Sequence, residues 1–305
     1  LQDRTILCAM GERYLSSNGL TLAYQEFGKV KDPVILMIMG LGGQMIEWPE
    51  SLCEDLASRG YRVIRFDNRD IGLSEKLEQS RGPAAFKMAL CSILKLPIKA
   101  PYTLMDMADD TVGLLDSLAI NSAHLVGLSM GGMIAQIIAG QRPERARSLT
   151  SIMSSSGRRS LPGANPDVWL HMAMRPSGSP KKLLENHAVR TLQMIGSPGY
   201  APSKHALRSR VVKSFKRSYY PQGQRRQLAA ILASGDRVSI LQKITAPTLV
   251  VHGKRDPLVP VAAGVDTALQ IPGAKLELID GMGHDLPDPL LPHLADLISS
   301  HAGQS

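Results

Sequence analysis

The sequence predicts an α/β fold in which a mostly parallel, twisted β-sheet is covered by helices on both faces. Short apolar runs of strand length alternate along the chain with longer segments of helical periodicity. This alternation is typical of parallel sheets, because a helix usually connects one parallel strand to the next. With 305 residues and 44% hydrophobic content, the chain also has enough apolar material for a large buried core.

The predicted elements begin with a β-hairpin. Residues 12–27 alternate polar and apolar positions around Asn18-Gly19, a dipeptide suited to a tight hairpin turn. The later apolar runs predict buried strands at 33–39, 61–66, 123–126, 148–153, 248–252 and 275–279. The segments of helical period predict helices at 48–58, 105–118, 130–140, 261–269 and 290–299.

The alternation of strand and helix stops after residue 153 and resumes near residue 248. The stretch between is rich in Arg, Lys, Pro and helix-forming residues. We therefore predict a core domain made of residues 1–154 and 239–305, interrupted by a helical cap at 155–238. Because the sheet pattern resumes after the cap, we interpret it as an insertion into one domain.

The net charge of +8 is concentrated in the predicted cap. Residues 155–238 contain 15 Lys and Arg against 3 Asp and Glu, so the rest of the chain is slightly acidic. Such a segment fits a solvated helical surface, and it also fits attraction of acidic substrates, anionic lipid or a partner. Because no basic motif is interleaved with aromatic residues, the sequence does not indicate nucleic-acid binding.

The composition predicts a soluble, cytoplasmic protein without integral membrane association. The longest apolar stretches, 33–43 and 128–140, fall short of the roughly 20 residues that a membrane span needs. No signal peptide is visible, but the first residue is not Met, so secretion stays open. Cys8, Cys53 and Cys91 lack Cys-x-x-Cys spacing, which predicts buried apolar thiols and no disulfide or metal site.

The strongest functional signal is a Gly-x-Ser-x-Gly motif at the junction of a predicted strand and helix. Residues 123–133 read AHLVGLSMGGM, the arrangement of a sharp turn that exposes a serine at the carboxyl edge of a sheet. Glycines two residues on either side leave room for the crowded turn. We predict that Ser129 is a nucleophile and that the backbone N–H of Met130 is an oxyanion donor at the helix start.

A serine nucleophile needs a base, and the base needs an acid that fixes its tautomer. Both follow downstream, each in a loop after a predicted strand: Asp256 after 248–252 and His284 after 275–279. The chain order Ser, Asp, His, with each residue at a strand end, completes a catalytic triad. Asp285 is a less suitable acid, because an immediate neighbour in sequence rarely reaches back to the histidine ring. His252 lies at the end of an apolar strand and is predicted to be structural.

With these residues in place, the sequence resembles the α/β-hydrolase superfamily over essentially its whole length. Within that superfamily it is similar to the bacterial esterase group that includes aclacinomycin methylesterase and cofactor-free haloperoxidases. Residues 67–74, DNRDIGLS, resemble the family's Asp-x-Arg-x-x-Gly-x-Ser loop, which implies a shaping role. Residues 39–43, MGLGG, stand where many members have His-Gly, and the resemblance implies that the backbone N–H of Leu41 is the second oxyanion donor.

The sequence thus predicts a serine hydrolase that cleaves a small or medium-sized carboxylic ester through an acyl-enzyme, with no cofactor and no metal. The same triad leaves open hydrolysis of a carbon–carbon bond, thioester or lactone, as well as perhydrolysis and acyl transfer to an alcohol. A ligand-binding protein that turns over slowly is an alternative of a different class, because a fold does not fix a function. The sequence leaves the oligomeric state open.

Overall fold

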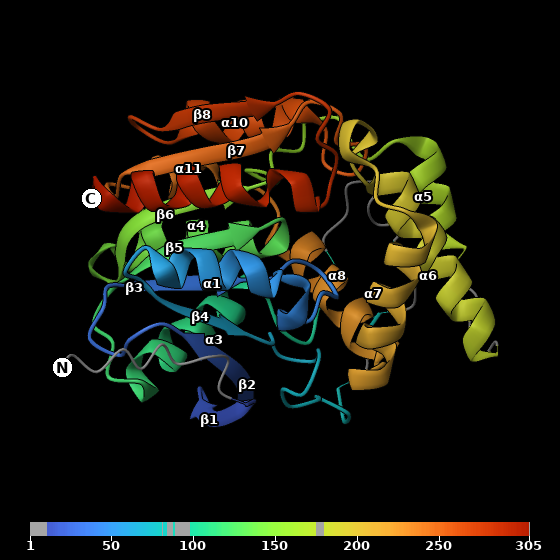
Figure 1. Cartoon of the computed structure of the whole chain (residues 1–305), viewed down its shortest axis with the longest axis horizontal. Coiled ribbons are helices and arrows are strands. Elements are labelled where there is room, and N and C mark those ends of the chain that lie inside the picture. The colour runs from blue at the N-terminus through green and yellow to red at the C-terminus, as the bar shows by residue number, and fades with distance from the viewer. Residues whose placement is uncertain (1–10, 81, 84–87, 89–97, 175–179, 305) are drawn as a thin grey trace.

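A computed structural model describes residues 11–80, 82–83, 88, 98–174 and 180–304 of the chain. The described part forms an eight-stranded β-sheet between layers of helices (Figure 1). Its strands are β1 (Arg13–Ser17), β2 (Leu20–Phe27), β3 (Val34–Ile38), β4 (Arg62–Phe66), β5 (Ala123–Leu128), β6 (Ala146–Ile152), β7 (Thr248–Gly253) and β8 (Lys275–Ile279). They follow the order β1-β2-β4-β3-β5-β6-β7-β8 across the sheet.

The first two strands form the predicted hairpin. Asn18 and Gly19 occupy its turn with φ angles of 49° and 77°, a left-handed conformation that these residue types adopt at little cost. β2 also pairs antiparallel with β4, and every strand pair beyond β4 is parallel. The fold class predicted from the sequence is therefore confirmed.

Helical layers bury both faces of the sheet. The helices of these layers are α1 (Glu50–Ser58), α3 (Leu104–Ser117), α4 (Met130–Gln141), α10 (Val261–Gln270) and α11 (Leu291–Gly303). α1 and α11 pack on one face, whereas α3 and α4 pack on the other. Ile35 of β3 points into the first layer and its neighbour Leu36 into the second, as the twofold alternation of a strand requires.

The described chain between β6 and β7 is helical. It contains α5 (Pro166–Ala173), α6 (Lys181–Ile195), α7 (Lys204–Arg217), α8 (Pro221–Ser234) and the short α9 (Val238–Leu241). Val189 of α6 packs with Leu207 and Val211 of α7 in a small apolar cluster separate from the sheet. Figure 1 shows α5, α6 and α7 grouped beside one end of the sheet. This is the end at which β5, β6 and β7 terminate.

A buried arginine joins the two segments through which the chain leaves β6 and returns toward β7. Arg237 is 2% exposed, and its guanidinium donates to the backbone carbonyls of Ser155 (2.7 Å) and Gly235 (2.8 Å). Its backbone N–H also donates to the carbonyl of Ser156. Burial lowers the pKa of Arg237 to about 10. The outgoing and returning segments are thus held together by one side chain.

None of the helices among the described residues has both the length and the apolarity needed to cross a bilayer. Cys53 is a free, fully buried thiol, and burial raises its pKa to about 12. It therefore packs as an apolar side chain. Cys8 and Cys91 lie outside the described residues.

Candidate active site

Ser129 lies in a sharp turn between the end of β5 and the start of α4. Its φ and ψ are 54° and −116°, a region that non-glycine residues avoid and that is often associated with functional sites. The turn is fixed from both sides, because the N–H of Ser129 donates to the carbonyl of Ile152 (2.8 Å) and its carbonyl accepts from the Ser154 hydroxyl (2.8 Å). The backbone around the serine is therefore set by the end of β6.

The two glycines of the motif are required by close contacts. A Cβ at Gly127 would lie 2.3 Å from the carbonyl oxygen of Gly131, and a Cβ at Gly131 would lie 2.0 Å from that of Ile38. Both distances are far below van der Waals contact. The first glycine lets α4 turn back on β5, and the second lets α4 begin directly against the end of β3.

The structure brings Ser129 together with the two downstream residues singled out by the sequence. Nε2 of His284 lies 3.1 Å from Oγ of Ser129, and Nδ1 of His284 lies 2.6 Å from Oδ2 of Asp256. Asp256 and His284 are 7% and 8% exposed. The ring nitrogen facing the buried carboxylate carries a proton, so the other nitrogen is left free to accept one from the serine.

The carboxylate of Asp256 is oriented by its own loop. Oδ1 accepts hydrogen bonds from the backbone N–H groups of Leu258 (2.9 Å) and Val259 (2.8 Å), which leaves Oδ2 to face His284. His252 also lies near this oxygen, with Nε2 at 3.6 Å. However, Nε2 of His252 donates to the carbonyl of Val259 at 2.8 Å, and burial lowers the pKa of His252. A neutral His252 therefore supports the loop that carries Asp256.

The loop after β3 passes directly over the serine. A Cβ at Gly40 would lie 3.2 Å from Cβ of Ser129, so the backbone approaches the hydroxyl side of the turn closely. Leu41 follows in this loop, and Met130 follows Ser129 at the first position of α4. Neither backbone N–H has a hydrogen-bond acceptor among the described residues. The geometry leaves both groups available to a ligand beside Ser129.

Gln227, a residue that the sequence did not single out, holds this loop from α8. Its side-chain oxygen accepts from the N–H of Gly42 at 2.9 Å, and its nitrogen donates to the carbonyl of Arg69 at 2.9 Å. The side chain is fully buried. The β3 loop, which lacks the histidine common in the family, is therefore supported from the helices between β6 and β7.

The loop at 67–74 anchors the same helices. Asp67 accepts from the N–H of Met45 (2.7 Å) and lies 2.7 Å from a guanidinium nitrogen of Arg217 in α7. Asp70 accepts two hydrogen bonds from Arg226 in α8, at 2.6 and 2.8 Å. Burial acts to raise the pKa of Asp70, but the hydrogen bonds from Arg226 hold it below its ordinary value. These carboxylates hold helices in place and do not reach the serine.

The end of α6 contacts the loop that carries His284. The backbone N–H of His284 donates to the carbonyl of Ile195 at 2.7 Å. Ser197, which follows the end of α6, makes two more contacts with this loop. Its hydroxyl accepts a hydrogen bond from the N–H of Gly283 (2.9 Å) and donates one to the carboxylate of Asp285. Burial raises the pKa of Asp285. Asp285 is thus bonded to Ser197, which explains why it does not compete with Asp256.

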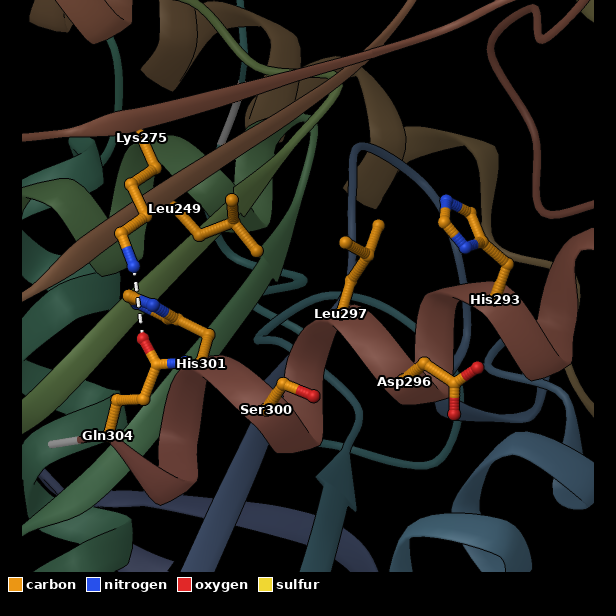
Figure 2. Close-up of a pocket in the computed structure, with 8 residues that line it drawn as sticks. All are labelled: Leu249, Lys275, His293, Asp296, Leu297, Ser300, His301 and Gln304. Carbon is orange, nitrogen blue, oxygen red and sulfur yellow. Dashed lines mark hydrogen bonds between the residues drawn. The ribbon is translucent and has the colours of Figure 1, made fainter.

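Two surface grooves have none of Ser129, Asp256 and His284 in their lining. One of about 220 Å³ runs along α11 beneath the starts of β7 and β8, where Lys275 donates to Gln304 at 3.0 Å (Figure 2). It opens at the opposite end of the strands from Ser129. A second groove, of about 290 Å³, is lined by Glu78, Ser80, Gly82 and Pro83 and by the start of α8. Among the described residues, no group of His, Cys, Asp and Glu side chains is arranged to hold a metal ion.

Comparisons with known proteins identify relatives in sequence and in fold. A rhodomycin D methylesterase of Streptomyces sp. (strain C5) is 27% identical over 96% of this chain and 98% of its own length. A poly(3-hydroxyalkanoate) depolymerase of Ectopseudomonas oleovorans is 31% identical over 60% of this chain and 62% of its own. The crystal structure of an enol-lactonase from Burkholderia xenovorans LB400 superimposes with a TM-score of 0.74 at 22% identity, covering 95% of this chain and all of that one.

The relatives confirm the resemblance that the sequence motifs indicated, and a family model extends it along the chain. The model of the alpha/beta hydrolase fold matches residues 33–288. This range includes the turn at Ser129 and the loops of Asp256 and His284, together with all the helices between β6 and β7. The chain belongs to the α/β-hydrolase fold family.

Proposed function

We propose that this chain is a carboxylic ester hydrolase in which Ser129, His284 and Asp256 act as a catalytic triad. The observation that carries the proposal is the continuous hydrogen-bonded line from the Ser129 hydroxyl through the imidazole to the buried carboxylate, at 3.1 and 2.6 Å. Each residue stands at a strand end, on a backbone fixed by its own hydrogen bonds. A serine hydroxyl held in this way is activated by the adjacent base.

In the proposed mechanism, Oγ of Ser129 attacks the ester carbonyl while Nε2 of His284 takes the hydroxyl proton. The carbonyl oxygen becomes an oxyanion, which accepts hydrogen bonds from the backbone N–H groups of Leu41 and Met130. His284 then returns the proton to the departing alkoxide, and an acyl-enzyme remains on Ser129. Water then attacks this acyl group as His284 takes its proton. The bond from the acyl carbon to Oγ breaks, His284 returns the proton to Oγ of Ser129, and the carboxylic acid is released. Asp256 stabilises the imidazolium in both steps.

We also propose that residues 155–238 form a cap over a core made of 1–154 and 239–305. The small apolar cluster between α6 and α7 supports this division, since these helices have packing of their own. Arg237 lies at the boundary and joins both connecting segments. A substrate would bind between this cap and the carboxyl ends of the strands.

The substrate class that we propose is a small or medium-sized carboxylic ester, hydrolysed in the cytoplasm without a cofactor. Methyl esters are the first candidates, because the rhodomycin D methylesterases match nearly the whole chain. Carbon–carbon bond hydrolysis, thioester and lactone hydrolysis and perhydrolysis use the same triad, and each is tested with its own substrate beside the ester assay.

The test is hydrolysis of p-nitrophenyl esters from acetate to octanoate and of carboxylic methyl esters, by wild type and Ser129→Ala. We expect the mutation to lower kcat by at least about 1,000-fold, because the nucleophile is removed while binding persists. Ser160→Ala, at an exposed turn position, is the matched control and should retain full activity.

An organophosphonate probe followed by mass spectrometry identifies the reactive residue in the same samples. Labelling of Ser129 together with turnover supports the ester hydrolase. Stoichiometric labelling without turnover of any ester, thioester or lactone would instead indicate a binding protein. Turnover that persists unchanged in Ser129→Ala would contradict the triad.

A further inference from the structure

Large apolar side chains are exposed where α5 meets α6. Trp169 and Leu170 are 49% and 52% exposed, Met174 is 70% exposed, and Leu183 at the start of α6 is 49% exposed. Most of the other large apolar side chains of the described residues are buried in the two layers beside the sheet. An exposed apolar group of this kind normally marks an interaction site.

The local geometry places these side chains on one surface. Leu170 and Met174 are one helical turn apart, joined by the hydrogen bond from the N–H of Met174 to the carbonyl of Leu170. α5 and α6 pack side by side, with the rings of His171 and His187 stacked at 4.1 Å. Val168 turns inward and is 4% exposed, so the outer side of α5 carries the tryptophan and leucine.

Two lysines adjoin the apolar side chains directly. Lys181 and Lys182 form the first turn of α6 immediately before Leu183, and both are exposed. We call Trp169, Leu170, Met174, Lys181, Lys182 and Leu183 the hairpin surface. It combines an exposed indole and aliphatic side chains with two cations.

The surrounding helices extend the positive charge. On α6 and α7 the exposed cations include Arg190, Lys204, Lys213 and Lys216, and none of these has a carboxylate partner among the described residues. The single acidic residue of the two helices, Glu185, is buried beside Arg208. Asp167 in the first turn of α5 is exposed and offsets one of these charges. The exposed cations of α6 and α7 outnumber it, so the potential around the hairpin surface is positive.

We propose that the hairpin surface docks on an anionic lipid bilayer. Leucine and methionine side chains bury apolar area in the outer acyl region, and an indole is suited to the headgroup level. Lysines beside them reach anionic headgroups while their aliphatic stems lie along the apolar boundary. The attachment is peripheral, since α5 has only 8 residues and α6, with 15, is basic. It goes beyond the proposed ester hydrolysis and does not depend on it.

Peripheral docking brings the end of the molecule that carries Ser129 toward the membrane. α6 runs from the hairpin surface to Ile195, whose carbonyl holds the backbone of His284. Esters dissolved in or released from the bilayer would then reach the enzyme without crossing the full aqueous phase. The opposite end of the sheet, with the β2–β3 connection, faces away.

The chain contains two tryptophans, and only one of them is placed to report docking. Trp48 is fully buried, whereas Trp169 is half-exposed. We expect vesicles of phosphatidylcholine and phosphatidylglycerol to shift the fluorescence of wild type to the blue, and brominated lipid to quench it. The difference between wild type and Trp169→Phe isolates the signal of Trp169. Vesicles of phosphatidylcholine alone should leave the spectrum nearly unchanged.

Sedimentation with the same vesicles measures affinity. The double variant Lys181→Glu/Lys182→Glu should lower the partition coefficient by at least about tenfold, because each basic residue near an anionic surface contributes substantially. The matched control is Lys29→Glu/Lys31→Glu, which reverses two exposed lysines flanking the 68% exposed Val30 at the other end of the molecule. The control should bind within about twofold of wild type.

Three outcomes would overturn the proposal. The first is that wild type does not bind anionic vesicles at low salt. The second is that the lysine variants of the hairpin surface and of the control lose vesicle affinity equally. The third is that the protein binds vesicles without any change in the fluorescence of Trp169. The last outcome would indicate electrostatic adsorption without an oriented surface. Far-UV circular dichroism and a cooperative thermal transition confirm that each variant is folded, independently of any ester hydrolysis.

Discussion

At the turn that carries Ser129, the carbonyl of Ile38 leaves no space for a side chain on Gly131. The predicted distance for an added Cβ is 2.0 Å, and the neighbour is backbone, which cannot rotate away. We expect Gly131→Ala to destabilise the protein by about 2–3 kcal/mol, the usual range for overpacking. The ester hydrolase activity of the folded variant should also fall, because the turn that carries Ser129 must shift.

The measurement is urea unfolding combined with ester hydrolysis. Gly163→Ala is the control, since nothing lies within 4 Å of a Cβ at that position, and its free energy of unfolding should change by less than about 0.5 kcal/mol. Equal effects at the two glycines would show that the close contact does not matter.

Ser129, Asp256 and His284, which the structure brings within hydrogen-bonding distance, could be singled out because each has a recognisable local sequence. Ser129 has glycines at fixed spacing, and Asp256 and His284 follow apolar runs of strand length. No local sequence pattern identifies Gln227 or Ser197. Gln227 contacts Gly42 across 185 positions of sequence and Ser197 contacts Gly283 across 86, so their roles arise only from tertiary packing.

At the scale of elements, the end of α6 positions the loop of His284. Ser197 is 1% exposed, and Ser197→Ala removes both the acceptor of the Gly283 N–H and the donor to Asp285. We expect kcat to fall about tenfold with little change in KM, because the imidazole is misplaced while the substrate still binds. Ser197→Thr, which keeps the hydroxyl, should recover part of the loss.

Steady-state kinetics separate this role from a loss of stability. Ser203→Ala removes the N-cap hydrogen bond of α7 and should cost about 1 kcal/mol of stability without lowering kcat. If Ser197→Ala behaves like Ser203→Ala, Ser197 does not position the base.

α8 is attached to the loop after β4 by a buried ion pair. Arg226 and Asp70 are 3% and 0% exposed. Replacing Arg226 by Gln leaves the carboxylate without its charged partner, and we expect a loss of about 3 kcal/mol at pH 7. Arg142→Gln, in an exposed pair with Asp109, should cost less than about 0.5 kcal/mol.

The pH dependence of that loss follows from the pKa of Asp70. Burial alone would raise this pKa, and Arg226 holds it below the ordinary value of 3.8. The pair therefore adds stability above pH 3.8, and the contribution disappears as the pH falls through the lower pKa of the folded state. Urea unfolding should show that the difference between wild type and Arg226→Gln shrinks as the pH is lowered below 3.8. A difference that is constant with pH would exclude the ion pair as its cause.

At the scale of the whole molecule, the alternation of strands and helices was sufficient to predict the fold class. A strand buried on both faces leaves a short continuous apolar run in the sequence, and a helix packed on the sheet leaves apolar positions at helical period. The order of strands across the sheet leaves no such pattern. The attachments of α7 and α8 to the 67–74 loop were equally hidden, although the sequence identified that loop as a shaping element.

Arg237 limits how the helices between β6 and β7 can move relative to the sheet. Its guanidinium ties the carbonyls of Ser155 and Gly235 to one another in a site that water does not reach. The segment that leaves β6 and the segment that returns toward β7 are therefore held to each other. We expect them to move together as one unit. We expect any opening motion to occur further out, at the α5 end of this segment, while the hydrogen bonds of Arg237 and the contacts of the end of α6 with the His284 loop stay formed.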